Sequence, residues 1–197
     1  MTALATTLVL GGARSGKSAF AEQLIGDSGL ARIYLATATA GDDEMRSRIA
    51  HHRERRGDGW VTVEEPMALV DALTREAIHG RAVLVDCLTL WLSNLLCADV
   101  PADEILVRVD AVAQAAGARA APTLIVTNEV GLGLVPEHPL GRAFRDVTGL
   151  AHQRLAAGAD EIYAGLLGMM LRLFPAPLVS FRPGQSAAFF GAPAGQP

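Results

Sequence analysis

One short stretch of the sequence has the composition and spacing of a phosphate-binding loop. The stretch is GGARSGKS, which fits the pattern GxxxxGK[ST] and consists of Gly11, Gly12, Ala13, Arg14, Ser15, Gly16, Lys17 and Ser18. Glycines allow backbone N–H groups to close around phosphate oxygens, and a helix that starts there adds positive potential. Lys17 is then expected to reach the β- and γ-phosphates, and the Ser18 hydroxyl to bind Mg²⁺. The alternative is a glycine-rich turn that carries a lysine by chance. An apolar run before the motif and a helix-like segment after it favour nucleoside triphosphate binding.

A carboxylate on the metal side of such a site is expected at the end of a neighbouring strand. Asp86 closes the apolar run AVLVD and is the candidate for a second Mg²⁺ ligand beside Ser18. Its alternative role is structural, as a buried carboxylate that caps the following turn CLTLW. The acidic group Asp42, Asp43 and Glu44 is expected to cap a helix N-terminus, where negative charge is favourable.

The segment EMRSRIAHHRERR (44–56) places two adjacent histidines among five arginines. On a helix that advances about 100° per residue, His51 lies within about 60° of both Arg48 and Arg55. The two guanidinium groups can bind phosphate oxygens, and they disfavour imidazolium, which keeps His51 neutral and nucleophilic near neutral pH. A neutral imidazole can attack phosphorus to form a phosphoramidate, which then passes its group to a second acceptor. The segment alone leaves open the alternative of a basic helix face in water.

His52 points in a different direction on the same helical wheel. It shares a stripe with Met45 and Ile49, so packing or hydrogen bonding inside the protein is expected rather than nucleophilic chemistry. The two neighbouring histidines are therefore not equivalent.

Five short apolar runs alternate with longer segments of helical character. The runs are rich in β-branched residues and leucine and cover 7–11, 32–38, 82–88, 123–129 and 161–167. Such runs predict strands buried on both faces, as in a parallel sheet. The segments that could form crossover helices cover 17–26, 42–56, 66–79, 102–118 and 139–157. We therefore expect an α/β fold of the phosphate-loop NTPase type, a mainly parallel sheet flanked by helices, with ligands at the carboxyl ends of its strands.

Length and composition indicate one globular domain. The chain has 197 residues, 50% hydrophobic and 19% charged, with a net charge of −4, so it lacks the general basic footprint of a nucleic-acid-binding protein. Residues 1–173 are expected to form a single nucleotide-binding transferase domain, followed by an irregular Pro/Gly/Ala-rich segment, 174–197. The interrupted apolar runs predict no membrane span, and the N-terminus is unlike a signal peptide, which predicts a cytoplasmic protein. Cys87 and Cys97 are expected to be reduced core residues.

Together these motifs resemble the bifunctional adenosylcobinamide kinase/adenosylcobinamide-phosphate guanylyltransferase family of cobalamin assembly. The similarity extends to about residue 173, and its landmarks are GGARSGKS, IYLATA, the HH segment, WVTVE, VLVDCLTLWLSNLL and NEVGLGLVP. The glycine loop occurs in many families, whereas the HH segment and NEVGLGLVP are more particular. The resemblance implies that ATP or GTP phosphorylates adenosylcobinamide. GMP from GTP is then attached to that phosphate through a guanylylated histidine.

By motif position the resemblance assigns the guanylylated histidine to His51, in agreement with the helical wheel, and Lys17 is the other catalytic residue. The implied nucleotide contacts are the loop Gly11 to Ser18 together with Ala36, Thr37, Ala38, His52, Arg53, Glu54, Arg55, Glu64 and Asp86. The implied cofactor is Mg²⁺, the implied substrates are adenosylcobinamide, its phosphate, ATP and GTP, and the implied assembly is a trimer. Gly57 and His152 depart from the residues common in relatives.

Two other functions fit parts of the sequence. A phosphate-loop kinase for another small molecule would use His51 only to bind phosphate. A non-enzymatic nucleotide switch is disfavoured because the guanine-selecting motif NKxD is missing. The loop that follows 123–129 also has two interpretations, because Asn128 and Glu129 could meet a ligand there or only cap the loop.

Overall fold

The computed structural model describes residues 6–39, 43, 54, 56–175 and 180–181. The strands are β1 (Thr6–Gly11), β2 (Arg32–Ala36), β3 (Trp60–Glu64), β4 (Ala82–Asp86), β5 (Thr123–Asn128), β6 (Glu161–Leu166), β7 (Met169–Phe174) and β8 (Ser180–Phe181). The helices are α1 (Lys17–Gly26), α3 (Leu69–Thr74), α4 (Leu88–Cys97), α5 (Ala102–Gly117) and α6 (Pro139–Gly158), with a 3₁₀ helix, η1, at Glu76–Ile78.

The strands form one sheet in the order β3-β2-β4-β5-β1-β6-β7-β8. The strands from β3 to β6 in this order are parallel to one another, and β7 and β8 are antiparallel additions at one side. The register aligns the strand ends, Gly11 with Asn128 and Gly165, and Ala36 with Glu64 and Asp86. Several residues predicted to bind nucleotide therefore lie along the carboxyl edge of the sheet, where open α/β folds bind ligands.

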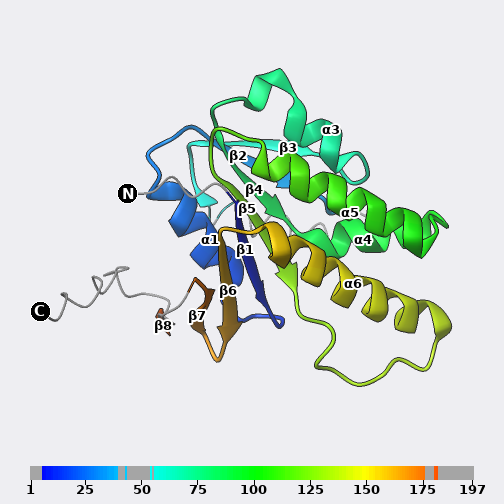
Figure 1. Ribbon diagram of the computed structural model, residues 1–197. Helices are drawn as coiled ribbons and strands as arrows, with labels where there is room; N and C mark the ends of the chain where they lie inside the picture. The colour runs from blue at the N-terminus through cyan, green and yellow to red at the C-terminus, as the bar shows by residue number, and fades with distance from the viewer. Residues whose placement is uncertain (1–5, 40–42, 44–53, 55, 176–179, 182–197) are drawn as a thin grey trace, which may run out of the picture.

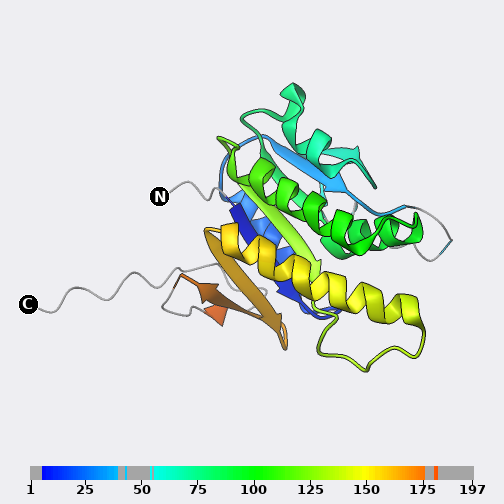
Figure 2. The ribbon, with the colours of Figure 1, turned by 45° about the vertical axis from the view of Figure 1, so that its right-hand side comes forward.

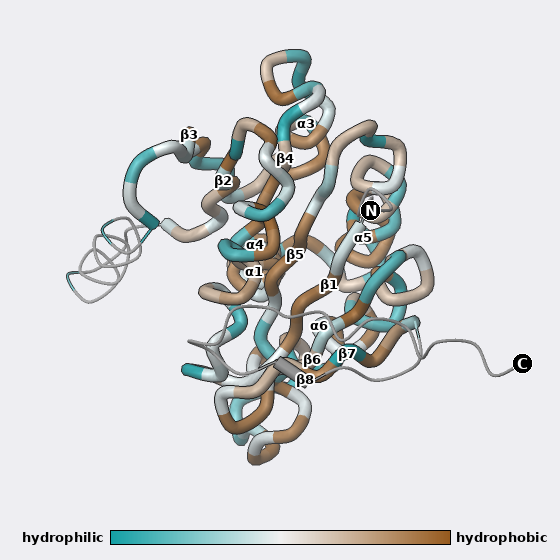
Figure 3. The backbone as a smooth tube through the Cα atoms, turned by 90° about the vertical axis from the view of Figure 1, so that its left-hand side faces the viewer, coloured by the Kyte–Doolittle hydropathy of each residue, from teal (hydrophilic) through white to brown (hydrophobic). Residues whose placement is uncertain are grey.

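Helices cover the sheet on both faces (Figure 1). The helices α3, α4, α5 and α6 pack on one face around Trp91, Leu92 and Val109, and α5 and α6 run side by side there (Figure 2). Among the described helices, α1 packs on the opposite face through Phe20 and Leu24. The central strands β4, β5 and β1 are hydrophobic along much of their length, as Figure 3 shows, because both of their faces are buried. The predicted α/β fold with a mainly parallel sheet is confirmed.

The predicted elements match the structure closely where the apolar pattern was clear. All five predicted strands are present, and each ends within two residues of its predicted bounds. The predicted helices at 17–26, 102–118 and 139–157 are α1, α5 and α6, whereas 66–79 contains the short α3 followed by η1. Most of the predicted helix 42–56, including the acidic residues Asp42 and Glu44, lies outside the described residues.

The helix α4 was predicted only as a turn. Its sequence is apolar on nearly all sides, so it does not show the one-sided pattern of a surface helix. Its buried residues Leu88, Trp91, Leu92 and Leu95 nevertheless follow helical spacing. No helix among the described residues, α4 included, is both long enough and apolar enough to cross a bilayer.

The sheet continues beyond the last predicted strand. A hairpin turn at Leu167 and Gly168, both with left-handed φ values, leads from β6 into β7. Ser180 and Phe181, which belong to the segment predicted to be irregular, pair with Leu171 and Met170 as β8. The pairing covers part of the open edge of β7, which would otherwise expose unpaired backbone groups.

The two cysteines differ in their environments. Both are free thiols, Cys87 is buried, and Cys97 is exposed. Burial raises the pKa of the Cys87 thiol, and the neighbouring Asp86 carboxylate raises it further. The prediction that both are core residues is wrong for Cys97, because this residue ends α4, where the helix emerges from the core.

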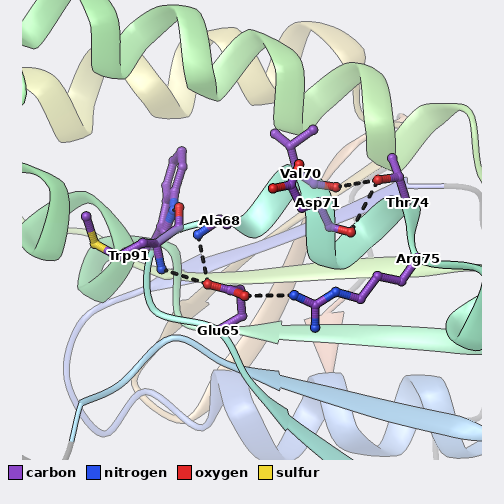
Figure 4. A network of polar contacts seen from close by, with 8 residues as sticks. Glu65, Ala68, Val70, Asp71, Thr74, Arg75 and Trp91 are labelled. Atoms are coloured by element: carbon purple, nitrogen blue, oxygen red, sulfur yellow. Dashed lines mark hydrogen bonds and ion pairs between the residues drawn. The ribbon is translucent and has the colours of Figure 1, made fainter.

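The Glu65 carboxylate, three residues before the N-cap residue Ala68, binds the backbone at the start of α3 (Figure 4). Glu65 Oε1 accepts hydrogen bonds from the backbone N–H groups of Ala68 at 2.9 Å and Met67 at 3.3 Å. Its other oxygen, Oε2, accepts a hydrogen bond from Arg75 Nη2 at 3.0 Å. These groups satisfy N–H donors at the helix N-terminus and connect the end of β3 to α3.

Glu65→Gln is expected to lower the free energy of unfolding at neutral pH by about 1 kcal/mol. The hydrogen bond from Ala68 is the main cause that lowers the pKa of Glu65 below its ordinary value of 4.5, and the bonds from Met67 and Arg75 add to it. Because the pKa is lower in the folded state, the stabilisation is fully present above the ordinary value and is lost as the pH falls through the folded-state value. Urea unfolding of both proteins between neutral and acidic pH should show the difference shrinking in acid. Glu76→Gln, at an exposed site, serves as the control, and a difference independent of pH would contradict the prediction.

Candidate nucleotide-binding site

The glycine loop connects the end of β1 to the start of α1 near the middle of the sheet. Gly12, Ala13 and Arg14 are exposed, whereas the side chains of Ser15 and Lys17 are buried. Lys17 Nζ donates a hydrogen bond to the carbonyl oxygen of Gly12 at 3.1 Å. The Lys17 side chain therefore spans the loop, from the start of α1 back to the residue that follows β1.

The loop backbone has the geometry of an anion cradle. Arg14 and Gly16 have left-handed φ values of 57° and 88°, and such residues within a turn direct successive N–H groups towards one side. Gly16 is the N-cap of α1 and has no side chain to cap it, and the first turn contains no acidic residue. The first helical hydrogen bond runs from the Phe20 N–H to the Gly16 carbonyl, so the preceding N–H groups have no partner within the helix. These features are suited to phosphate binding.

The loop is packed tightly against β6. A Cβ atom added at Gly11 would lie 2.7 Å from the Gly165 carbonyl oxygen and 2.7 Å from Ser15 Oγ. A Cβ atom added at Gly165 would lie 2.8 Å from Ser15 Oγ and 2.6 Å from Met170 Cε. Gly11 therefore requires glycine, because an added Cβ would meet the backbone of β6, whereas at Gly165 the added Cβ would press on the side chains of Ser15 and Met170.

Gly165→Ala is expected to weaken GTP binding about tenfold, because the new methyl group would press on Ser15 Oγ and Cβ and shift this residue of the loop. Calorimetric titration with GTP measures the change. Gly149→Ala is a matched control, since a Cβ atom there would meet nothing within 4 Å. Thermal unfolding of both variants separates a local shift of the loop from a loss of the fold. Unchanged GTP affinity in a folded Gly165→Ala protein would contradict the prediction.

The predicted metal ligand Asp86 lies at the carboxyl end of β4. Its Oδ2 accepts a hydrogen bond from the Tyr34 hydroxyl at 2.8 Å, and Tyr34 comes from the adjacent strand β2. Burial raises the pKa of Tyr34, and the nearby Asp86 carboxylate raises it further. The phenol therefore remains a hydrogen-bond donor. This bond, rather than a cap on the start of α4, is the contact that the structure gives the Asp86 side chain.

The stretch Ala36 to Ala38 follows β2 and is tied to β4. The buried Thr37 hydroxyl donates to the Cys87 carbonyl oxygen at 2.7 Å and accepts from the Cys87 N–H at 2.8 Å. Asn94 Nδ2 donates to the Thr37 carbonyl oxygen at 2.9 Å. Because the Thr37 side chain is engaged in these bonds, a nucleotide contact here would fall on the neighbouring backbone.

The other predicted nucleotide contacts are placed only in part. Glu64 ends β3 and is exposed, next to Ala36 in register, and Glu54 is also exposed. The predicted nucleophile and its neighbours, His51, His52, Arg53 and Arg55, lie outside the described residues. Arg56 is described, and its guanidinium carbon lies 3.3 Å from the centre of the Tyr34 ring.

Asn128 and Glu129 are held by contacts within the protein. Asn128 Nδ2 donates to Thr89 Oγ1 at 3.2 Å, and Glu129 Oε1 accepts from the Gly131 N–H at 2.6 Å. Glu129 Oε2 lies 3.6 Å from His152 Nδ1, while His152 Nε2 is 2.8 Å from Thr127 Oγ1. Burial lowers the pKa of His152, although Glu129 opposes this shift. Of the two interpretations, these contacts favour capping of the loop.

The residues predicted to bind Mg²⁺ suit that ion chemically. A hydroxyl oxygen from Ser18 and a carboxylate oxygen from Asp86 are hard donors, which Mg²⁺ prefers. Within the described part of the chain, no group of three or more His, Cys, Asp or Glu side chains could hold a metal ion. Mg²⁺ is usually bound by one or two protein ligands together with substrate phosphates and water.

The sequence matches a known family over most of its length. Residues 7–173 match the family described as cobinamide kinase/cobinamide phosphate guanyltransferase. The chain belongs to this family. A bifunctional adenosylcobalamin biosynthesis protein of Pseudomonas aeruginosa, CobP, is 47% identical over 171 residues, which is 87% of this chain and 98% of the relative. The protein of the same description from Escherichia coli, CobU, is 40% identical over 178 residues, with 84% and 98% covered.

Membership of the cobinamide kinase/guanyltransferase family confirms the predicted resemblance and the predicted enzyme class. The chain is a transferase with kinase and guanylyltransferase activities. The match includes the glycine loop, Asp86 and the histidine pair, and it ends at the last residues of β7.

Solved structures support the fold independently. The RadB recombinase aligns with a TM-score of 0.54 at 16% identity, and the alignment covers 91% of this chain and 88% of the recombinase chain. A Pyrococcus horikoshii protein, PH0250, aligns with a TM-score of 0.53 at 12% identity, covering 86% of both chains. At such low identity these similarities show the shared fold alone.

Proposed function

We propose that this chain phosphorylates the aminopropanol hydroxyl of adenosylcobinamide with ATP or GTP. It then transfers GMP from GTP to the phosphate just formed, through a guanylylated His51, to give adenosylcobinamide-GDP. The observation that carries the proposal is the anion cradle at residues 11–18, in a member of the cobinamide kinase/guanyltransferase family that also carries the Asp86 carboxylate at the same edge of the sheet.

In the phosphoryl-transfer step, the loop N–H groups and the Lys17 ammonium bind the β- and γ-phosphates. The substrate hydroxyl oxygen attacks the γ-phosphorus, the bond from that phosphorus to the β-phosphate oxygen breaks, and the hydroxyl proton is released. Lys17 stabilises the negative charge that gathers on the leaving oxygen. Ser18 and Asp86 would hold Mg²⁺, which would supply further neutralisation of phosphate charge.

In the guanylyl-transfer step, a neutral imidazole nitrogen of His51 attacks the α-phosphorus of GTP. The bond to the β-phosphate breaks, and pyrophosphate leaves. A phosphate oxygen of adenosylcobinamide phosphate then attacks the same phosphorus, and the P–N bond breaks, returning its electron pair to the imidazole. The two reactions thus attack different phosphorus atoms. They require either two placements of the triphosphate or a movement of the segment that carries His51.

The test is to incubate the protein with α-labelled GTP and Mg²⁺ in the absence of a cobinamide. We expect a protein-bound label that is stable in alkali and labile in acid, as a phosphoramidate is, and that is released as product when adenosylcobinamide phosphate is added.

The second candidate is a phosphate-loop kinase without nucleotidyl transfer. It would phosphorylate its substrate under the same conditions and form no covalent adduct. If phosphoryl transfer turns over while no label from the α-position is retained, the guanylyl-histidine part of the proposal is wrong.

The proposal includes assembly as a trimer, as the resemblance implies, and a location in the cytoplasm, as the N-terminal sequence and the interrupted apolar runs predict. Light scattering during gel filtration measures the assembly directly. A mass other than three times that of the chain would contradict this part without affecting the two reactions.

A further inference from the structure

Tyr34 contacts two parts of the site that are far apart in the sequence. Its hydroxyl donates to Asp86 Oδ2 at 2.8 Å, at the end of β4. Its ring lies under the Arg56 guanidinium, whose central carbon is 3.3 Å from the ring centre. Arg56 is the last residue of the arginine-rich segment 44–56. One side chain therefore joins this segment to the predicted metal-binding carboxylate.

The Tyr34 side chain is held in one position. It is 7% exposed, and it lies in the core cluster between the sheet and α1. The Trp60 ring meets it edge-on, with centroids 6.3 Å apart and an interplanar angle of 86°. A ring packed in this way cannot turn its hydroxyl to another partner without disturbing the core.

We propose that Tyr34 is a positioning residue that orients the Asp86 carboxylate for Mg²⁺ and makes this orientation depend on Arg56. This inference rests on the proposed function, and it adds a residue that neither the glycine loop nor the histidine segment contains.

The chemistry of the contact supports this role. An ionised carboxylate has about four lone-pair positions, so a hydrogen bond to Oδ2 fixes its plane and leaves capacity for a metal or a metal-bound water. Partners that orient a metal ligand in this way typically contribute 10- to 100-fold to metal affinity or activity. A guanidinium over the ring is attracted to the π-electrons, and it draws electron density from the ring, which strengthens the hydroxyl as a donor.

Tyr34→Phe tests the contact with Asp86, because it removes the hydroxyl and keeps the ring that packs on Arg56 and Trp60. GTP binding is measured by calorimetry over a series of Mg²⁺ concentrations, with no cobinamide present. We expect the Mg²⁺ concentration for half-maximal enhancement of GTP binding to rise about tenfold, with GTP affinity in excess chelator unchanged. An unchanged Mg²⁺ dependence overturns the proposal.

Tyr163→Phe is a matched control. The Tyr163 hydroxyl also donates to a carboxylate, Glu161 Oε2, at 3.0 Å, and its ring packs against Phe20 with centroids 4.9 Å apart. This variant loses the same kind of hydrogen bond at a different strand, so its Mg²⁺ dependence should remain that of the unaltered protein. A shift equal to that of Tyr34→Phe would mean that loss of any buried hydroxyl produces the effect, and would overturn the proposal.

Arg56→Leu tests the other end of the link. We expect a smaller shift in the same direction, and we expect Arg56→Leu combined with Tyr34→Phe to need no more Mg²⁺ than Tyr34→Phe alone, because Arg56 acts through the hydroxyl. Independent, multiplying shifts would overturn the dependence on Arg56.

These binding measurements do not require either transfer reaction. If the unaltered protein transfers neither phosphate nor GMP to cobinamides, the proposed function fails while the Mg²⁺ titrations still test Tyr34. If both reactions proceed and the titrations of Tyr34→Phe and the unaltered protein coincide, the proposed function stands and the positioning role is wrong.

Discussion

Lys17→Ala is expected to slow both phosphoryl transfer and guanylyl transfer by about 10³-fold or more. The Lys17 ammonium is buried in the loop, where a charge interacts strongly with phosphate because water is largely excluded. Both reactions are proposed to use this one cradle, so one substitution should remove both. Single-turnover assays with γ-labelled ATP and with α-labelled GTP measure the two rates separately.

Arg108→Ala is the control for Lys17→Ala. Arg108 is an exposed cation on α5 that pairs with Glu104, so its loss should leave both rates unchanged. Loss of only one activity in Lys17→Ala would show that the two reactions do not share the loop.

Lys17 also permits a direct mapping of the site, because it is the only lysine in the sequence. Pyridoxal phosphate carries an aldehyde close to a phosphate group and forms Schiff bases with amines, and borohydride reduction makes them permanent. Peptide analysis then distinguishes Lys17 from the terminal amine. Protection of Lys17 by ordinary GTP is the expected result.

His51→Ala is expected to lower guanylyl transfer by about 10⁴-fold or more while phosphoryl transfer continues. The nucleophile has no substitute if the phosphoramidate is obligatory, whereas attack on the γ-phosphorus does not need an imidazole. Adenosylcobinamide phosphate should therefore accumulate when the variant is given adenosylcobinamide, ATP and GTP. Chromatography of the products with labelled phosphate measures this directly.

His52→Ala is the matched control for this variant, since it removes the adjacent imidazole from the same segment. It should retain the covalent label from α-labelled GTP. A label that persists in His51→Ala, or that disappears only in His52→Ala, would assign the nucleophile to another residue.

The glycine loop and the parallel sheet could be predicted because their signals are local. The phosphate-binding motif needs a strand before it and a helix after it, and the apolar runs at Thr6–Gly11 and Ala82–Asp86 indicated the buried strands directly. The position of Asp86 at the carboxyl edge of the sheet could be predicted in the same way, because the carboxyl ends of parallel strands lie at the same edge. The helix α4 was missed because a helix that is apolar on nearly all sides has no polar face to reveal its period.

The roles of Tyr34 and Gly165 could not be predicted, because they depend on contacts between distant segments. In the sequence, Tyr34 has no feature that separates it from other strand residues. Its role depends on the pairing of β2 with β4, which brings Asp86 within hydrogen-bond distance of its hydroxyl. A signal for Gly165 was present, since a glycine inside a strand-like run often marks a close backbone approach, but its partner, the loop around Ser15, was not evident from the sequence. The position of His51 relative to the loop remains a prediction, because that residue lies outside the described part of the chain.

The anion cradle formed by residues 11–18 has a consequence for which nucleobase the enzyme accepts. The contacts predicted for the loop are made by peptide N–H groups, the Lys17 ammonium and the Ser18 hydroxyl, and all of them are directed at the phosphates or their metal ion rather than at the base. The loop is therefore expected to bind the triphosphates of ATP and GTP equally well, as the proposed use of either donor requires. Any preference for guanine in the second reaction must come from protein residues outside the loop that contact the base.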